Sequence, residues 1–184
     1  MSTGTVIALI VVIVAIAAAI FVYMQQRSKR LRAKYGPEYD RLAHDFGSTR
    51  RAESDLERRE KRLEKIHIRA LTNEEREKFA ETWREVQASF VDNPATAVSG
   101  ADGLVGDLMK SRGYPMGDFE QRAADVSVDH PRVVENYRAA HAIAERREPG
   151  QANTEDLRGA MVHYRALFED LLEQPVTAHE EVRR

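Results

Sequence analysis

The chain contains an apolar run of twenty residues, Thr5 to Met24, with no charge, no proline and no glycine. At about 1.5 Å per residue, a helix of this length is about 30 Å long, which matches the hydrocarbon core of a bilayer. Every backbone N–H and C=O in hydrocarbon must be satisfied within the segment, so such a run has to be helical. We therefore predict a transmembrane helix over residues 5–24, with Tyr23 placed as an interfacial aromatic residue.

Basic residues follow the apolar run, whereas the four residues before it carry none. The basic residues are Arg27, Lys29, Arg30, Arg32 and Lys34. The positive-inside rule then predicts a single-pass membrane protein, with its N-terminus outside and its C-terminal part in the cytoplasm. The same juxtamembrane segment, residues 25–37, also favours anionic lipid by about 1 kcal/mol per basic residue. We therefore expect lipid contact through residues 5–34.

Two other topologies compete with this interpretation. Residues 17–19 are three alanines, which resemble the small residues of a signal-peptide cleavage site. Signal peptides carry their basic residues before the apolar core, whereas here they follow it, so the pattern favours an uncleaved anchor. An anchor with an exported domain remains an open alternative. The chain has no cysteine, which excludes a disulfide framework and fits either compartment.

The net charge of −2 conceals a strong asymmetry along the chain. Residues 27–34 carry +5, residues 35–70 carry +1 and residues 71–184 carry −8. An acidic distal part is repelled by nucleic acid, so we expect no nucleic-acid partner.

Residues 38–70 are predicted to form charged stalk helices. Gly36-Pro37 interrupts any helix that continues from the membrane, because proline disfavours helical geometry at the residue before it. A short helix over 38–46 would end at Gly47, and Ser48 would cap a second helix that runs from Thr49 to about His67. A solvated stalk is the main interpretation, and a helix lying along its own domain is the alternative.

Residues 71–174 are predicted to form a soluble helical bundle, because apolar residues recur there with helical spacing and no segment alternates as a strand does. Thr72 with Glu75 forms a capping box, and Asn93-Pro94 starts the next helix, which stops at Gly113. Two further helices are predicted, one over residues 118–127 and one from 130 to about 147 with Asp129 as its cap. Thr154 is predicted to cap the last helix. The polar tail, 175–184, is predicted to be disordered. The fold class is therefore all-α, with one transmembrane helix followed by a bundle of five to six helices.

Three glycines recur every third residue within one predicted helix, at Gly100, Gly103 and Gly106. Each costs about 1 kcal/mol relative to alanine, so a compensating use is expected. Close approach of another helix is the main interpretation, and a poorly formed segment is the alternative.

Neither a metal site nor a cofactor site is predicted. The Glu-x-x-His pattern of di-metal bundles occurs once, at Glu64 and His67, where two copies on facing helices are needed. Phosphate-loop, dinucleotide and nucleophile-elbow patterns are absent from the sequence.

The best candidate pocket comprises Tyr137, His141, Tyr164 and Arg165. Tyr137 and His141 are spaced i,i+4 on one helix face, and Tyr164 belongs to a helix expected to pack nearby. A buried histidine beside tyrosine and arginine can act in acid–base chemistry or bind an anion. The plainer interpretation is a hydrogen-bonded core histidine between two tyrosines whose hydroxyls need partners. Asp129-His130 is likewise read as a helix start rather than a catalytic dyad.

Several stretches carry a family resemblance. They are Trp83 to Gln87, Phe90 to Pro94, Arg112 to Pro115 and Asp129 to Val134, together with Tyr35 to Tyr39 and Thr154 to Arg158. The chain resembles uncharacterised single-span membrane or "secreted" proteins of high-GC, actinobacterial-type bacteria. The resemblance implies a bacterial source and supports the domain boundaries, and it brings no activity or site residue with it.

Together these patterns favour a membrane-anchored scaffold or adaptor that binds a protein partner, and not an enzyme. The alternative is a ligand-binding or enzymatic helical domain with a pocket around Tyr137, His141 and Tyr164. The identity of the partner and self-association into a homo-oligomer stay open.

Overall fold

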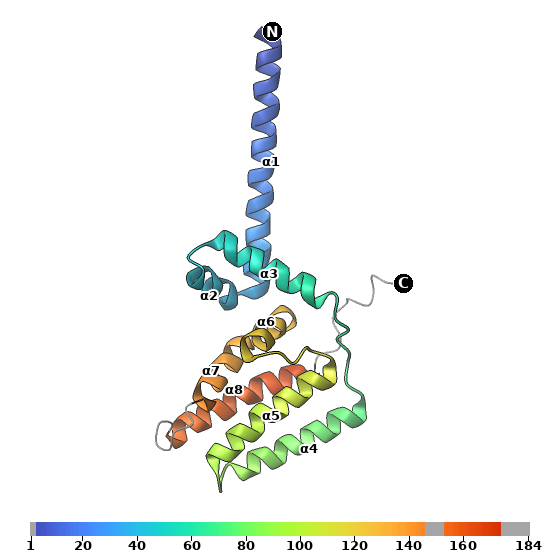
Figure 1. The fold of residues 1–184 in the computed structure, drawn as a ribbon, viewed down its shortest axis with the longest axis vertical. Helices are drawn as coiled ribbons and strands as arrows, with labels where there is room; N and C mark the ends of the chain where they lie inside the picture. The colour runs from blue at the N-terminus through green and yellow to red at the C-terminus, as the bar shows by residue number, and fades with distance from the viewer. Residues whose placement is uncertain (1–2, 146–152, 174–184) are drawn as a thin grey trace. The chain divides into compact units, whose positions relative to one another are not determined.

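A computed structural model describes residues 3–145 and 153–173. Its described part is all-helical, with eight helices and no strand, so the predicted fold class is confirmed: an N-terminal apolar helix precedes a helical bundle (Figure 1). The chain forms two compact units, Met1–Glu53 and Ser54–Arg184. The tail 175–184, predicted to be disordered, and the expected helix end at Arg147 lie outside the described residues.

Helix α1, Thr3–Tyr35, is 33 residues long (Figure 1). The apolar side chains that precede its basic segment face outward, as Ile13 with 56% and Phe21 with 66% of their surface exposed illustrate. By length and composition α1 can span a membrane, and the apolar window falls within residues 10–35. A helix of this length is about 50 Å long, so about 20 Å extends beyond a bilayer core. The predicted juxtamembrane segment is therefore helical as far as Tyr35.

The helix break predicted at Gly36-Pro37 is confirmed. Helix α1 ends at Tyr35, and α2, Pro37–Asp45, begins with the proline at its first helical position. Gly36 joins the two helices at φ +49°, where a residue with a side chain is strained. The chain therefore turns sharply where α1 ends.

Glu53 connects α1, α2 and α3 (Thr49–Leu63) within the first unit by hydrogen bonds. It lies in α3, where its Oε1 accepts hydrogen bonds from Ser28 Oγ and, at 2.9 Å, from Tyr39 Oη. The buried apolar residues of this unit are Leu31, Tyr35, Tyr39, Leu42 and Ala52. The end of α1 is thus packed and hydrogen bonded rather than a loose linker.

Helix α3 ends at Leu63, four residues earlier than the expected His67. The chain turns over residues 64–66 and then has no regular secondary structure as far as Thr72, and Arg69 N donates to Arg112 O at 2.9 Å. Gly113 has φ +94°, and a Cβ there would lie 2.5 Å from the carbonyl oxygen of His67. This close backbone approach is a tertiary contact, which helical periodicity in the sequence does not encode.

The expected stalk, residues 38–70, is divided between the two units at Glu53. In the second unit, Arg59 Nη1 donates to Ser127 Oγ at 3.1 Å, and Leu63 joins the main hydrophobic core. The second half of α3 therefore packs along its own domain, which was the alternative interpretation.

Five helices complete the second unit: α4 Asn73–Ser89, α5 Pro94–Arg112, α6 Phe119–Asp129, α7 Val134–Ala144 and α8 Thr154–Glu173. Helix α8 packs against α5 and α7, and α4 packs against α5. Consecutive partners α4 and α5, and likewise α7 and α8, run antiparallel (Figure 1). Trp83 of α4 stacks on Phe168 of α8, with ring centroids 4.7 Å apart. The apolar stripe of α8 supplies the centre of the core.

Two predicted helix starts and one stop are confirmed. Thr72 and Glu75 form both hydrogen bonds of a capping box. Asn93 Oδ1 accepts from Thr96 N at 3.1 Å, and Pro94 is the first residue of α5. Gly113 ends α5 in the left-handed conformation.

Two other predicted caps are wrong. Asp129 is the last residue of α6, and its Oδ2 accepts from Tyr114 Oη at 3.0 Å; α7 begins only at Val134. Thr154 is the first residue of α8, and Asn153 is its cap, because Asn153 Oδ1 accepts from Asp156 N at 2.8 Å. In α8 a neighbouring polar side chain takes the role, whereas the N-cap of α7 is Val133, which makes no side-chain cap hydrogen bond.

The glycine stripe does not receive another helix backbone. A Cβ at Gly103 would meet nothing within 4 Å, and one at Gly100 would meet only the Val86 side chain at 3.5 Å. The predicted close packing is therefore wrong at these positions, although α5 itself is well formed and buries its other face.

Candidate functional site

The residues Tyr137 of α7 and Tyr164 of α8 lie in the bundle core, and both are completely buried. Tyr164 Oη donates to Asp102 Oδ1 of α5 at 2.9 Å. Burial of a hydroxyl is favourable only when it finds a partner. Asp102 therefore fixes Tyr164 between α5 and α8.

His141 lies one helical turn after Tyr137. The Phe119 ring of α6 stacks on its imidazole, with centroids 3.6 Å apart and planes 10° apart. His141 Nδ1 is 3.9 Å from Asp102 Oδ1, and Nε2 is 3.5 Å from Glu145 Oε1. The structure thus gathers both tyrosines, the histidine and one carboxylate from three helices.

Two polar atoms of this cluster are buried without a hydrogen-bond partner in the described part of the chain. They are Tyr137 Oη and His141 Nδ1. The plainer sequence interpretation expected partners for the histidine and for both tyrosine hydroxyls, and the structure gives such a partner to Tyr164 but not to Tyr137 Oη or His141 Nδ1. An orphaned buried polar atom calls for an explanation, since leaving it unpaired costs about 1–3 kcal/mol.

Burial sets the protonation of the two tyrosines. It raises the pKa of Tyr137 to about 12, with the guanidinium of Arg122 opposing and Asp102 adding to the increase. Burial also raises the pKa of Tyr164, and the charge of Asp102 acts in the same direction. Both groups stay protonated at neutral pH, so each is available as a hydrogen-bond donor and neither as a base.

The structure does not bring Arg165 into this cluster. Its side chain is 57% exposed and pairs with Glu169 at 2.7 Å, one turn along α8. Asp102 and Arg122 take part instead, and sequence reasoning missed both. Asp102 directly follows Ala101, a core position of α5, and this adjacency was the available signal.

Asp129 and His130 face different elements. Tyr114 binds Asp129, whereas His130, with 1% of its surface exposed, pairs through Nδ1 with Asp170 of α8. The two residues therefore form no dyad with each other, although Asp129 is not the helix start expected. Together these hydrogen bonds fasten the end of α6 to the bundle.

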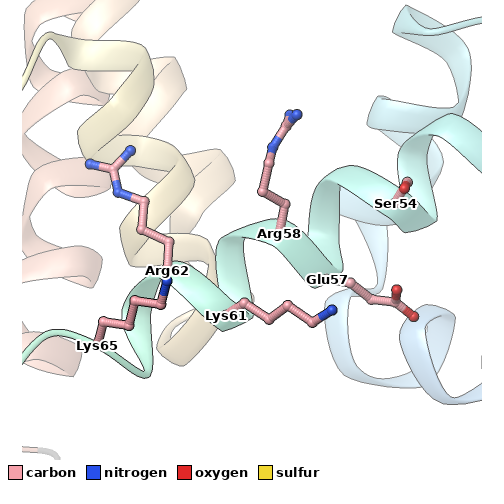
Figure 2. A pocket seen from close by; sticks show the side chains of 6 residues that line it. All are labelled: Ser54, Glu57, Arg58, Lys61, Arg62 and Lys65. Atoms are coloured by element: carbon pink, nitrogen blue, oxygen red, sulfur yellow. The ribbon is translucent and has the colours of Figure 1, made fainter.

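The second half of α3 and the turn after it form a basic groove of about 500 Å³ (Figure 2). Its lining residues are Ser54, Glu57, Arg58, Lys61, Arg62 and Lys65. Figure 2 shows Arg58 and Arg62 projecting from the same side of the helix, and Lys61 running toward Glu57. Arg58 pairs with Asp55, and Arg62 pairs with the buried Asp125 at 3.3 Å. These residues belong to the stalk predicted over 38–70, and no binding role was predicted for them.

The five juxtamembrane basic residues all lie on α1. Lys29, Arg30, Arg32 and Lys34 are exposed, and Arg27 is half-buried. Arg32 also pairs with Asp40 of α2 at 3.0 Å. The cationic segment is therefore presented on a rigid helix that the turn at Gly36 ends.

No group of three or more His, Cys, Asp or Glu suited to a metal ion is found within residues 3–145 and 153–173. Glu64 and His67 both lie beyond the end of α3, so they are not on one helix face. Comparisons of the chain with protein-family models, curated proteins and solved structures find no match.

Proposed function

We propose that the chain is a single-pass protein of a bacterial cell membrane whose cytoplasmic helical domain acts as a scaffold or adaptor for a protein partner. The observation that carries the proposal is a contrast in burial. The apolar side chains of α1 lie outward along the helix, whereas residues 54–173 bury a core of their own. An exposed apolar helix long enough to cross a bilayer core supports a lipid environment.

The basic residues that follow the apolar window support the N-out orientation. Reporter fusions after Arg184, one active only in the cytoplasm and one only outside, test it. We expect the cytoplasmic reporter alone to be active. Activity of the external reporter would overturn both the orientation and a cytoplasmic partner.

The adaptor role is tested with photo-crosslinking side chains at exposed apolar positions of the bundle. Val91 is 87% exposed at the α4–α5 turn, and Val162 is 54% exposed on α8. We expect one of these positions to crosslink a single protein reproducibly in intact membranes. A chain truncated after Glu53, which lacks the bundle, should not co-purify that protein in detergent. A crosslink to a second copy would identify self-association, and no specific product at either position would contradict the role.

A second candidate function rests on the orphaned atoms Tyr137 Oη and His141 Nδ1. A small polar ligand that bridges them beside Asp102 would satisfy both. This function predicts that a library of small polar metabolites contains a compound that raises the melting temperature of the full chain and not of its Tyr137→Phe variant. If no compound separates the two chains, the second candidate is wrong.

A further inference from the structure

The basic groove of α3 presents four cations at helical spacing i, i+3, i+4 and i+7, namely Arg58, Lys61, Arg62 and Lys65. The Arg58 side chain is 77% exposed and that of Arg62 is 41% exposed. Lys61 and Lys65 are also exposed, and neither forms an ion pair or side-chain hydrogen bond with another described residue. Cations left in water at this density form a surface for an anionic partner.

The rigidity of this groove comes from its other side. Asp55 pairs with Arg59 at 2.8 Å, Arg59 reaches Ser127, and Leu63 is part of the hydrophobic core. Helix α3 is therefore fixed to the bundle by one face and presents its lysines on the other. A cationic face on a fixed helix loses little backbone freedom on binding a planar array of phosphates.

We propose that this face, Arg58 to Lys65, binds the headgroups of anionic lipids in the membrane that α1 enters. The proposal rests on the membrane anchor of the proposed function. Arg58 follows the last residue of α1 by 23 residues, which span at most about 80 Å even when extended. Because the patch and the anchor belong to one chain, surface binding is an intramolecular step, so a modest patch suffices.

Charge favours lipid over nucleic acid as the occupant. Residues 71–184 carry −8, so a polyanion that surrounds the domain is repelled, whereas a flat anionic surface can meet the basic face alone. Each basic side chain close to such a surface strengthens binding about fivefold. The two unpaired lysines together therefore contribute about 30-fold.

The chain has no cysteine, so a single spin label can be placed without background. We would label Ser54→Cys in the groove of the full chain, reconstituted in nanodiscs of phosphatidylcholine with or without one third phosphatidylglycerol. We expect the accessibility of the label to a water-soluble relaxant to fall about twofold in anionic discs and not in neutral ones. High salt should restore the accessibility, because it shortens the Debye length and weakens the attraction between the lysines and the headgroups. A label at Val91→Cys, at the α4–α5 turn, should not change.

The matched variants separate the groove from general charge. Lys61→Gln/Lys65→Gln should abolish the lipid-dependent protection, whereas Lys78→Gln/Arg84→Gln removes two exposed charges from α4 and should retain it. Circular dichroism checks that each variant folds. Equal accessibility in both lipids, equal loss in the two variants, or equal protection by heparin in neutral discs would each overturn the proposal. None of these readouts needs a protein partner, so a failed adaptor role and a failed lipid site give different results.

Discussion

Helices α1 and α8 are both rich in apolar residues, yet they use them in opposite ways. The part of α1 before Arg27 carries apolar residues on all sides and exposes them, whereas α8 gathers most of its large apolar residues into one buried stripe: Met161, Tyr164, Leu167, Phe168 and Leu171. A helix that is apolar on all sides cannot be satisfied by one neighbouring face, while a stripe can. The distribution of apolar residues, more than their number, therefore decides whether lipid or protein surrounds a helix.

The largest effect should follow truncation of the α8 stripe. Phe168→Ala removes a ring that is buried and stacked on Trp83, so we expect it to lower the free energy of unfolding by about 3–5 kcal/mol. Phe21→Ala removes the same ring from the exposed surface of α1 and should leave bundle stability unchanged. Urea unfolding of the full chain in detergent, followed by circular dichroism, measures both. Similar losses in the two variants would show that α1 belongs to a protein core.

A charge placed in each helix should have the reverse outcome. Ile13→Lys puts an ammonium at the middle of the apolar run and costs about 3 kcal/mol of insertion free energy. Val162→Lys lies on the exposed side of α8 and should change bundle stability by less than about 0.5 kcal/mol. The fraction of chain that resists alkaline extraction from membranes reports the first change, and urea unfolding reports the second. An Ile13→Lys chain that is as firmly inserted as the parent would contradict a membrane span.

Tyr164 of α8 and Tyr137 of α7 should distinguish a buried hydroxyl with a partner from one without. Tyr164→Phe loses the hydrogen bond to Asp102 and should cost about 1–2 kcal/mol. Tyr137→Phe deletes a buried hydroxyl without a partner in the described chain and should be neutral or stabilise by about 1 kcal/mol. Urea unfolding of the two variants gives the comparison. Equal destabilisation would mean that the Tyr137 hydroxyl is satisfied by a bound molecule, as the second candidate function requires.

Alkaline pH should sharpen the same contrast. The pKa of Tyr137 is raised to about 12 by burial, from an ordinary value of 10.0, so the folded chain holds this proton more tightly than the unfolded chain does. Its contribution to stability is complete below pH 10 and is lost as the pH rises toward 12. Tyr137→Phe should therefore flatten the fall in urea midpoint over this window, while the parent chain declines more steeply. Identical slopes would mean that Tyr137 ionises as an exposed tyrosine does.

The sequence predicted those features whose signal is local. The break at Gly36-Pro37, the capping box at Thr72 and the stop at Gly113 each depend on a few adjacent residues, and each is present in the structure. The early end of α3 was not predictable from local signals. The segment that follows it is held by a hydrogen bond from Arg69 N to Arg112 O, and these two residues lie far apart in the chain. Tyr137 and His141 were brought together by helical periodicity, whereas Asp102 and Arg122 join them only through packing of α5, α6 and α8. Arg165 was assigned to the pocket because it follows Tyr164 in the sequence, but its side chain points to Glu169 and to solvent.

The smallest expected effect concerns one glycine in α8 and one in α1. A Cβ at Gly159 of α8 or at Gly4 of α1 would meet nothing within 4 Å, so both accept alanine without a clash. Gly159→Ala should raise bundle stability by about 1 kcal/mol, because alanine loses less backbone freedom than glycine when the helix forms. Gly4→Ala should leave the urea midpoint of the bundle unchanged, since α1 does not contribute to that core. Gly113→Ala is the opposing control and should destabilise, because its φ is +94° and a new methyl group would meet the backbone of His67. If Gly159→Ala lowered stability as Gly113→Ala does, α8 would have a neighbour at that position that the packing described here does not include.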